Sequence, residues 1–300
     1  MLAIIIPYYK ITFFKETLDS LANQTDKRFK VYVGDDASLE NCSVLLENYR
    51  GNFEFEYYRF ENNLGKSSLT MQWQRCIALC SDEQWMMILG DDDVLGATVV
   101  EQFYNNIKEV EQRGIHVIRF ASQKMDEVGT LTSKIYEHPK IERAVQFLFD
   151  KTRSSLSEYV FRKSQVLEIG FKDFPLAWYS DFLAVLEFSN FDTIYTINNS
   201  IVYVRLSELS ISGSTWNKDQ KIQANFEFYY YLVKNKYSHF SEMELNELYY
   251  MLNKCYINNK KQYLFFFKIL KLYFLKNNNK ENILFVKQII YYTIKNRIKI

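Results

Sequence analysis

Glycine and proline are scarce in this sequence of 300 residues, which contains only 9 Gly and 3 Pro. Such scarcity excludes a collagen-like or linker-dominated chain, and a hydrophobic content of 48% excludes an intrinsically disordered one. The chain is long enough for one large domain with an appendage, or for two ordinary domains. We therefore expect a folded protein with a substantial hydrophobic core.

Cysteine and histidine, which build many metal and disulfide sites, are also few. The 4 cysteines form no CxxC pair, which argues against a disulfide framework or a structural zinc site and fits a reducing compartment. Cys76 and Cys80 would share a helix face, and we interpret them as buried packing residues rather than metal ligands. The 3 histidines are too isolated to form a known metal-binding motif.

Long apolar runs are missing as well. The nearest candidate, residues 263–275, is interrupted by Lys268 and Lys271, so no segment is expected to span a membrane. The apolar run near the N-terminus is short and has neither the basic region nor the cleavage site of a signal peptide, so it predicts a buried strand. These features predict a cytoplasmic protein.

The first 121 residues contain a regular alternation of strand-like and helix-like segments. Apolar runs predict strands at residues 2–7, 30–35, 54–60, 85–89 and 115–121. Helical periodicity predicts helices at residues 13–23, 40–49, 67–80 and 98–113. This alternation is typical of an α/β fold whose mainly parallel sheet has helices on both faces.

A second half extends this sheet, and a helical region follows it. The pattern predicts helices at residues 141–150 and 180–189, and strands at residues 156–162 and 193–206. After residue 214 only helical spacing remains, at residues 218–236, 242–258, 261–275 and 283–298. We therefore predict a catalytic domain at residues 1–214 and a C-terminal helical appendage at residues 215–300.

Three consecutive carboxylates, Asp91, Asp92 and Asp93, directly follow the fourth predicted strand. Ligands of open α/β sheets bind at the carboxyl ends of the strands, so function is expected at this position. Three adjacent negative charges need a compensating cation, and hard oxygen ligands favour Mg²⁺ or Mn²⁺. The alternative is an acidic turn or helix N-cap ahead of residues 98–113, and the triplet alone does not decide between them.

A second pair of acids, Asp35 and Asp36, stands at the end of the second predicted strand. One carboxylate could accept hydrogen bonds from a nucleobase or a ribose. The other could hold the turn or cap the helix that is expected from Glu40. Capping alone accounts for one aspartate better than for two.

Taken in order along residues 1–95, these segments resemble the markers of the inverting glycosyltransferases of family 2. The similar segments are Ile4-Ile5-Ile6-Pro7-Tyr8-Tyr9-Lys10, Leu18-Asp19-Ser20-Leu21-Ala22-Asn23-Gln24-Thr25, Asp35-Asp36-Ala37-Ser38, Asn63-Leu64-Gly65 and Gly90-Asp91-Asp92-Asp93. Lys10 stands where the family usually has Asn. Gly90 stands where the first acid of its DxD motif is often found, so either Asp91 or Asp92 could take the leading role. The resemblance implies a nucleotide-diphospho-sugar transferase fold of the GT-A type.

The resemblance also implies roles for individual residues. Asp92 and Asp93 would hold Mn²⁺ or Mg²⁺, and Asp181 would be the catalytic base. The residues implied in donor binding are Pro7, Tyr9, Asp36, Asn63, Gly65, Asp91 and Arg205. For Asp181 the alternative is an ordinary N-terminal acid of its helix, with Ser180 as N-cap, and Arg205 could equally be an exposed or salt-bridged arginine.

The implied activity is transfer of a sugar, with inversion, from a nucleotide diphosphate sugar to a hydroxyl of a saccharide or lipid-linked saccharide. A UDP-sugar is the favoured donor, and the pathway would be synthesis of cell-surface polysaccharide or glycolipid. One alternative is a nucleotidyltransferase on a related α/β fold, although residues 7–10 lack the Gly-rich loop that cradles a triphosphate. Another is a catalytically idle sugar-nucleotide-binding or membrane-docking subunit, which the unusual Lys10 and Gly90 would fit.

Basic residues concentrate in the last part of the chain. Residues 254–300 hold eleven Lys or Arg against the single acid Glu281, a net charge of +10, whereas residues 1–253 carry a net charge of −9. Aromatic and aliphatic residues alternate with these lysines, as in helices that lie on an anionic membrane surface. We predict such docking at the inner face of the cytoplasmic membrane, with packing on the catalytic domain or a homodimer as alternatives. Nucleic acid is not an expected partner, because no nucleic-acid-binding motif is found.

Overall fold

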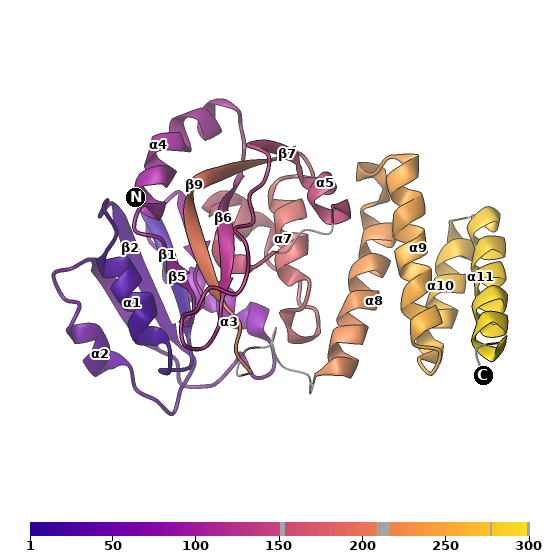
Figure 1. The fold of residues 1–300 in the computed structure, drawn as a ribbon, viewed down its shortest axis with the longest axis horizontal. Coiled ribbons are helices and arrows are strands. Elements are labelled where there is room, and N and C mark those ends of the chain that lie inside the picture. Colours follow the sequence, from indigo (N-terminus) through magenta and orange to yellow (C-terminus); the bar gives the residue numbers. More distant parts are fainter. Residues whose placement is uncertain (151–153, 209, 211–216, 277, 299–300) are drawn as a thin grey trace. The chain divides into compact units, whose positions relative to one another are not determined.

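The computed structural model describes residues 1–150, 154–208, 210, 217–276 and 278–298 (Figure 1). The chain divides into two compact units. The first, which we call the sheet unit, comprises Met1–Asp173 and Ser180–Trp216, and the second, the helical unit, comprises Phe174–Tyr179 and Asn217–Ile300. The domain boundary that we predicted after residue 214 lies outside the described residues.

One mixed sheet organises the sheet unit. Its strands are β1 (Leu2–Tyr8), β2 (Phe29–Asp35), β3 (Glu54–Arg59), β4 (Trp85–Ile88), β5 (Val94–Leu95), β6 (Val117–Met125), β7 (Ile141–Arg143), β8 (Tyr159–Arg162) and β9 (Thr193–Arg205). They are arranged in the order β3-β2-β1-β4-β8-β6-β9-β5, and β7 pairs with β9. Strands β3, β2, β1 and β4 are parallel, as are β6 and β9, whereas β8 runs antiparallel to both β4 and β6.

Helices cover both faces of this sheet, so the predicted α/β fold class is confirmed. They are α1 (Phe14–Ala22), α2 (Ser43–Glu47), α3 (Leu69–Ile77), α4 (Val99–Gln112), α5 (Ala144–Phe149), α6 (Lys163–Ile169) and α7 (Ser180–Phe188). On one face, Leu2, Ile4 and Ile6 of β1 share a core with residues of α1 and α4. On the other face, Phe171 packs edge to face on Trp73 of α3 and on Phe188 of α7, at centroid distances of 5.2 and 5.1 Å.

The secondary structure predicted from the sequence was wrong in a few segments where long-range contacts override the local periodicity of apolar residues. The helix expected at residues 141–150 begins as strand β7, in which Glu142 forms a buried ion pair with Arg119 of β6 at 2.6 Å. The strand expected at residues 156–162 begins as a 3-10 turn, Leu156–Glu158. The helix expected at residues 40–49 covers only Ser43–Glu47, and helix α6 was not predicted.

The helical unit contains α8 (Lys218–Asn235), α9 (Glu242–Asn258), α10 (Tyr263–Leu275) and α11 (Asn279–Ile298), with a 3-10 turn at Tyr237–His239. Helix α9 begins at a capping box, in which Ser241 Oγ accepts a hydrogen bond from Glu244 N and the Glu244 carboxylate accepts one from Ser241 N. Phe226 of α8 stacks on Phe265 of α10 at a centroid distance of 3.9 Å. None of the described helices combines the length and the hydropathy that crossing a bilayer requires.

A short piece from the middle of the chain belongs to the helical unit. Phe174–Tyr179 contains the 3-10 turn Pro175–Ala177, and the Tyr179 ring stacks on Phe228 of α8 at 4.6 Å. Leu176, Ala177 and Tyr179 all have positive φ, which is costly for residues with a side chain. Packing on α8 therefore stabilises a backbone path that local preference disfavours.

Candidate functional site

Asp91 connects the chain that follows β4 to the chain that follows β1. Its Oδ2 accepts hydrogen bonds from the backbone N–H groups of Tyr9 at 2.7 Å and Lys10 at 2.8 Å. Burial raises the pKa of this carboxyl group, and the two hydrogen bonds oppose that rise because they stabilise the carboxylate. Asp91 thereby fixes the β1 loop, which includes the predicted donor-binding residue Tyr9.

Asp93 connects the same loop to the opposite side of the sheet. Its Oδ1 accepts a hydrogen bond from Arg205 N at 2.9 Å, and its Oδ2 accepts one from Ser157 Oγ. Ser157 Oγ in turn accepts a hydrogen bond from Gly90 N at 3.0 Å. Both oxygens of Asp93 thus have partners within the protein, so its predicted role as a metal ligand would require it to exchange or share them.

Asp92 lies between these two connections. Its carboxylate makes no hydrogen bond to another residue in the described ranges, and its pKa is raised well above the usual range by burial and by the negative charges of Asp93 and Asp91. A Cβ atom at Gly90 would lie 2.9 Å from Asp92 Oδ1 and 3.1 Å from Asp93 Oδ2. Glycine at position 90 therefore leaves room for the Asp92 carboxylate, and this close approach is a physical reason for a residue without a side chain at that position.

The Arg205 guanidinium is buried, with the residue only 2% exposed, and its donors are used within the protein. Nε donates to the Asp92 carbonyl oxygen at 3.0 Å, Nη1 to the carbonyl oxygens of Asp126 and Glu127 at 2.9 and 3.1 Å, and Nη2 to the Glu16 carboxylate. This arrangement fixes the backbone of the aspartate loop. Contact between Arg205 and the donor diphosphate stays a prediction, and these bonds favour a positioning role.

Asp36 plays a similar part at the carboxyl ends of β2 and β3. Its oxygens accept hydrogen bonds from Leu64 N at 2.7 Å and Gly65 N at 2.9 Å, and the Arg75 guanidinium also donates to it. A Cβ atom at Gly65 would lie 2.7 Å from Asp36 Oδ2, so glycine is needed for this close approach. Asp36 thus holds the loop of Asn63 and Gly65, and a direct contact with the nucleoside stays a prediction.

The remaining predicted residues lie along the same edge. Pro7 is in β1 opposite Gly34 of β2, and Tyr9 is 42% exposed, with its carbonyl oxygen accepting a hydrogen bond from Ser38 Oγ at 2.6 Å. The loops after β1, β2, β3 and β4 are therefore joined by the Tyr9–Asp91, Tyr9–Ser38 and Asp36–Gly65 bonds. The structure brings these predicted donor residues to one edge of the sheet.

Asp181 is the second residue of α7 and is half-buried. Ser180, which we considered as the N-cap, is the first residue of that helix, and its Oγ donates to the Lys172 carbonyl oxygen at 2.7 Å. The pKa of Tyr159 is raised by burial and further by the negative charges of Glu158 and Asp181. The negative charge of Asp181 therefore acts on Tyr159, which follows Ser157, the partner of Asp93, by two residues.

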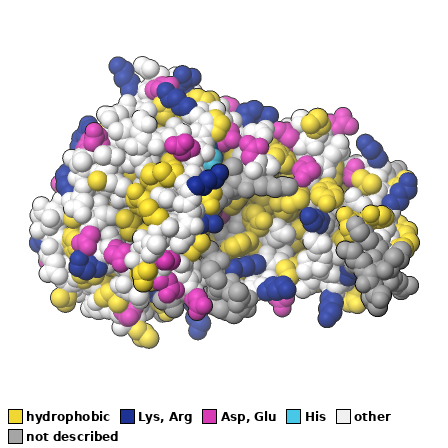
Figure 2. All heavy atoms as spheres, viewed as in Figure 1, with side chains coloured by type: hydrophobic (Ala, Val, Ile, Leu, Met, Phe, Trp, Pro, Cys, Tyr) yellow, Lys and Arg dark blue, Asp and Glu magenta, His cyan; other side chains and the backbone are white. Residues whose placement is uncertain are grey.

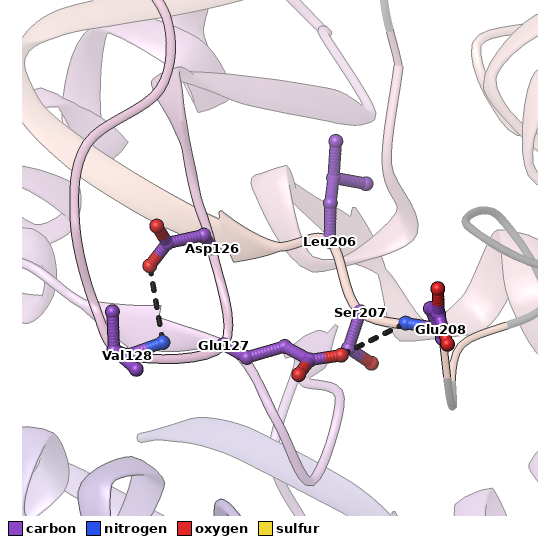
Figure 3. Close-up of a pocket in the computed structure, with 6 residues that line it drawn as sticks. All are labelled: Asp126, Glu127, Val128, Leu206, Ser207 and Glu208. Atoms are coloured by element: carbon purple, nitrogen blue, oxygen red, sulfur yellow. Dashed lines mark hydrogen bonds between the residues drawn. The ribbon is translucent and has the colours of Figure 1, made fainter.

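A pocket of about 500 Å³ that the sequence did not reveal lies beyond the ends of β6 and β9 (Figure 3). Its lining residues are Asp126, Glu127, Val128, Leu206, Ser207 and Glu208. Glu127 Oε1 accepts a hydrogen bond from Glu208 N at 3.0 Å, which joins the two sides of the pocket. The only sequence signal for it is the presence of acids after both strands, which is too common to be diagnostic.

A divalent cation fits the aspartate loop, although the described residues include no cluster of three or more His, Cys, Asp or Glu side chains arranged as metal ligands. Mg²⁺ and Mn²⁺ commonly use only one or two carboxylates and take their other ligands from substrate phosphates and water. Asp92 offers such a carboxylate, because no other described residue donates a hydrogen bond to it. Asp92 is accordingly the strongest candidate for a metal ligand.

The family model described as "Glycosyl transferase family 2" matches residues 3–179. This match includes every residue of the β1, β2, β3 and β4 loops discussed above and most of the sheet unit. The chain belongs to glycosyl transferase family 2. The predicted family and its GT-A type fold are thus confirmed, whereas Asp181 and Arg205 lie beyond the matched residues.

Solved structures of other glycosyltransferases share the fold. Residues 1–349 of TarS from S. aureus, in complex with UDP-GlcNAc, match with a TM-score of 0.61 and 15% identity over 86% of this chain and 73% of that chain. GalNAc-T7 with UDP, GalNAc and Mn²⁺ matches with a TM-score of 0.51 and 9% identity, over 84% of this chain and 55% of that one. At such identities the likeness is one of fold. Among curated proteins, no sequence matches this one.

Proposed function

We propose that this family 2 glycosyltransferase moves a sugar from a UDP-sugar to an acceptor hydroxyl with inversion, in the synthesis of a cell-surface polysaccharide or glycolipid. The observation that carries the proposal is the Asp92 carboxylate, which no other described residue binds and which lies between the anchored Asp91 and Asp93 at the carboxyl end of β4. The preference for a UDP donor is supported by the nucleotide in the TarS and GalNAc-T7 structures.

The Asp92 carboxylate would hold the Mn²⁺ or Mg²⁺, with the donor diphosphate supplying further oxygen ligands. Such an ion stabilises the negative charge that develops on a departing diphosphate. Asp91, Asp93 and Arg205 do not need to touch the ion for this, because their hydrogen bonds fix the loop that carries Asp92. Preorganisation of this kind lowers the cost of assembling the site during the reaction.

Asp181 would act as the general base. The acceptor oxygen forms a bond to the anomeric carbon, the bond from that carbon to the nucleotide diphosphate breaks, and the acceptor proton passes to the Asp181 carboxylate. A single displacement of this kind inverts the configuration at the anomeric carbon. Its transition state resembles an oxocarbenium ion, as in glycoside hydrolysis.

The nucleoside would lie over the loops after β1, β2 and β3. Tyr9 is exposed there and is available for contact with the base or ribose, and Pro7 shapes the chain that leads to it. The loop of Asn63 and Gly65, held by Asp36, offers backbone groups for further contacts. These loops and Asp92 would together determine the orientation in which the donor binds.

The helical unit would attach the enzyme to an anionic membrane surface on the cytoplasmic side, where a lipid-linked saccharide acceptor is accessible. Leu264, Phe267 and Phe274 of α10 are exposed, and Lys268 and Lys271 lie exposed between them. Figure 2 shows hydrophobic and basic side chains side by side on this unit. Exposed apolar residues flanked by lysines are the composition of helices that lie in a membrane interface.

A thermal-shift screen with UDP-GlcNAc, UDP-GalNAc and UDP-glucose, with and without Mn²⁺, tests the proposed function, because a bound donor stabilises the folded state. We expect a Mn²⁺-dependent rise in the melting temperature with at least one donor, together with slow release of UDP from it. A shift without UDP release would indicate an idle binding subunit. Pyrophosphate release from a nucleoside triphosphate and a sugar phosphate would indicate a nucleotidyltransferase.

A further inference from the structure

The pocket beyond β6 and β9 is lined by polar and apolar side chains and is connected directly to the aspartate loop. Arg205 Nη1 donates to the carbonyl oxygens of Asp126 and Glu127, which line the pocket, while its Nε donates to the Asp92 carbonyl oxygen at 3.0 Å. One guanidinium thus fixes both the pocket wall and the loop of Asp92. A ligand in this pocket would therefore lie close to the proposed reaction centre.

Ser207 is the observation that points to a ligand. The residue lines the pocket, is only 5% exposed, and its Oγ has no hydrogen-bond partner among the described residues. A buried hydroxyl without a partner costs free energy, so native proteins usually provide one from the protein, water or a ligand. A ligand hydroxyl in the pocket would complete the hydrogen bonding of Ser207.

The pocket lies on the side of the aspartate loop away from the nucleotide loops. In the sheet, β1, β2 and β3 lie on one side of β4, whereas β8, β6 and β9 lie on the other. The donor nucleotide, placed over the first set, would leave the second set for the group that receives the sugar. The pocket at the ends of β6 and β9 is in that second region.

Charge selects the class of ligand. Asp126, Glu127 and Glu208 surround the pocket, and Arg205 meets it only through backbone carbonyls. Carboxylates accept hydrogen bonds from hydroxyl groups and repel phosphate or carboxylate groups. Val128 and Leu206 provide apolar surface for the carbon-bound hydrogens of a sugar ring. The volume is within the range of small-molecule sites, about 300–1,000 Å³.

We propose that this pocket binds an uncharged sugar unit of the acceptor, with its hydroxyls donating to Glu127 and Glu208 and accepting from or donating to Ser207. The proposal rests on the proposed glycosyltransferase function and makes it more specific. A sugar unit that carries phosphate or carboxylate is excluded from this position. Any charged linker of a lipid-linked acceptor would then lie outside the pocket.

Saturation-transfer difference NMR on the full chain tests the pocket without requiring a donor. The probes are methyl β-glucoside and methyl β-galactoside as uncharged sugars and methyl β-glucuronide as an anionic one. We expect the wild-type protein to bind at least one uncharged probe and not the glucuronide. Ser207→Ala and Glu208→Gln should each weaken that binding by about tenfold, the effect of losing one hydrogen bond to a charged or buried partner. Glu137→Gln, an exposed acid outside the pocket, is the control and should bind as the wild type does.

Glu208→Lys gives a second and opposite readout, because it should weaken the uncharged probe and allow the glucuronide to bind. The proposal is overturned if the wild type binds no uncharged probe, or if Ser207→Ala and Glu208→Lys bind it as the wild type does. It is also overturned if Glu208→Gln instead raises the Mn²⁺ concentration needed for UDP release, since the pocket would then serve the cation. UDP release by the wild type reports separately on the proposed function, so the two can fail independently.

Discussion

Asp91 and Asp93 each use their carboxylate to bind backbone or hydroxyl groups on opposite sides of β4, whereas the Asp92 carboxylate accepts no hydrogen bond from another described residue. The three side chains are chemically identical, so their different roles come from the position of hydrogen-bond donors around them. Those donors are Tyr9 N, Lys10 N, Arg205 N and Ser157 Oγ. They lie 64 to 112 residues away in sequence from the aspartates that they bind.

Replacing Asp92 by Asn should lower the rate of UDP release by about 10² or more, because the proposed ligand of the metal and diphosphate is lost. The melting temperature should be unchanged or higher, since the change removes a buried charge that its neighbours repel. Asp93→Asn is the matched comparison and should lower stability by about 1–3 kcal/mol through its lost hydrogen bonds. Normal activity in Asp92→Asn would refute this assignment.

Replacing Asp181 by Asn should slow transfer to the acceptor by about 10² or more, because proton removal from the acceptor hydroxyl is lost. Donor binding should persist, so the donor-induced rise in melting temperature should stay close to that of the wild type. Asp82→Asn, at an exposed position, serves as the control. Simultaneous loss of the donor-induced shift would instead assign Asp181 a structural role.

His138 predicts how stability depends on pH. Burial, assisted by the positive charge of Arg119, lowers its pKa from 6.5 to about 4, and its Nε2 has no hydrogen-bond partner among the described residues. The His138 imidazole takes up a proton near pH 6.5 in the unfolded chain but only near pH 4 in the folded chain. The free energy of unfolding therefore falls as the pH falls through that window. The loss should be at most about 3 kcal/mol. His138→Gln should flatten this dependence in urea unfolding measured at pH 7 and pH 5, and an unchanged difference between the two pH values would contradict the assignment.

Among single residues, the sequence identified side chains that the fold brings to one edge of the sheet, and what they bind stays a prediction. Asp36 and Arg205 were predicted to contact the donor, yet their polar atoms are engaged with Leu64, Gly65 and the aspartate loop. A motif shows that a charged residue is needed at a position. It does not show whether the partner is a ligand or a distant backbone group, because that depends on the tertiary fold.

At the scale of elements, the segment Phe174–Tyr179 shows how strongly packing can override local preference. Its three residues with positive φ are stabilised by aromatic contacts with α8, among them the stacking of Tyr179 on Phe228. Phe174 also contacts Phe228, at a centroid distance of 6.2 Å. Phe228 is fully buried and is thus the central contact of this segment.

Phe228→Ala should destabilise the helical unit by about 3–5 kcal/mol, because it leaves a cavity and removes the partner of Tyr179. Urea unfolding followed by far-UV circular dichroism measures this loss. Phe267→Ala on α10, an aromatic residue that is 63% exposed, is the control and should change stability by less than about 0.5 kcal/mol. Equal effects of the two changes would refute the central role of Phe228.

Several helices and strands whose apolar residues recur at regular spacing were predicted to within a few residues. Helix α9 lies at the predicted residues 242–258, β1 is one residue longer than predicted, and α4 is one residue shorter at each end. Strand β7 and the turn Leu156–Glu158 were missed, because a buried ion pair and long-range strand pairing decide their conformation. Such long-range partners leave no periodic signal in the local sequence.

For the whole molecule, the separation of charge along the chain leads to a prediction about attachment. Full-length protein should sediment with vesicles that contain anionic lipid at low salt, and less so at high salt, because the lysines of α10 and α11 contribute about 1 kcal/mol each near such a surface. Replacing the exposed Lys268, Lys271 and Lys287 together by Gln should release the protein. Replacing three exposed lysines of the sheet unit, Lys66, Lys108 and Lys134, together by Gln is the control. Equal binding by both variants would leave packing or a homodimer as the role of these helices.

The membership of Phe174–Tyr179 in the helical unit also limits how the parts of this protein could be exchanged. Six residues from within the sheet unit's sequence pack with helices encoded after residue 216. A recombination event that exchanged only the C-terminal helices would leave Tyr179 without the ring on which it stacks, two residues before Asp181. The helices and this short segment therefore form one structural unit, although residues 180–216 of the sheet unit separate them in the sequence.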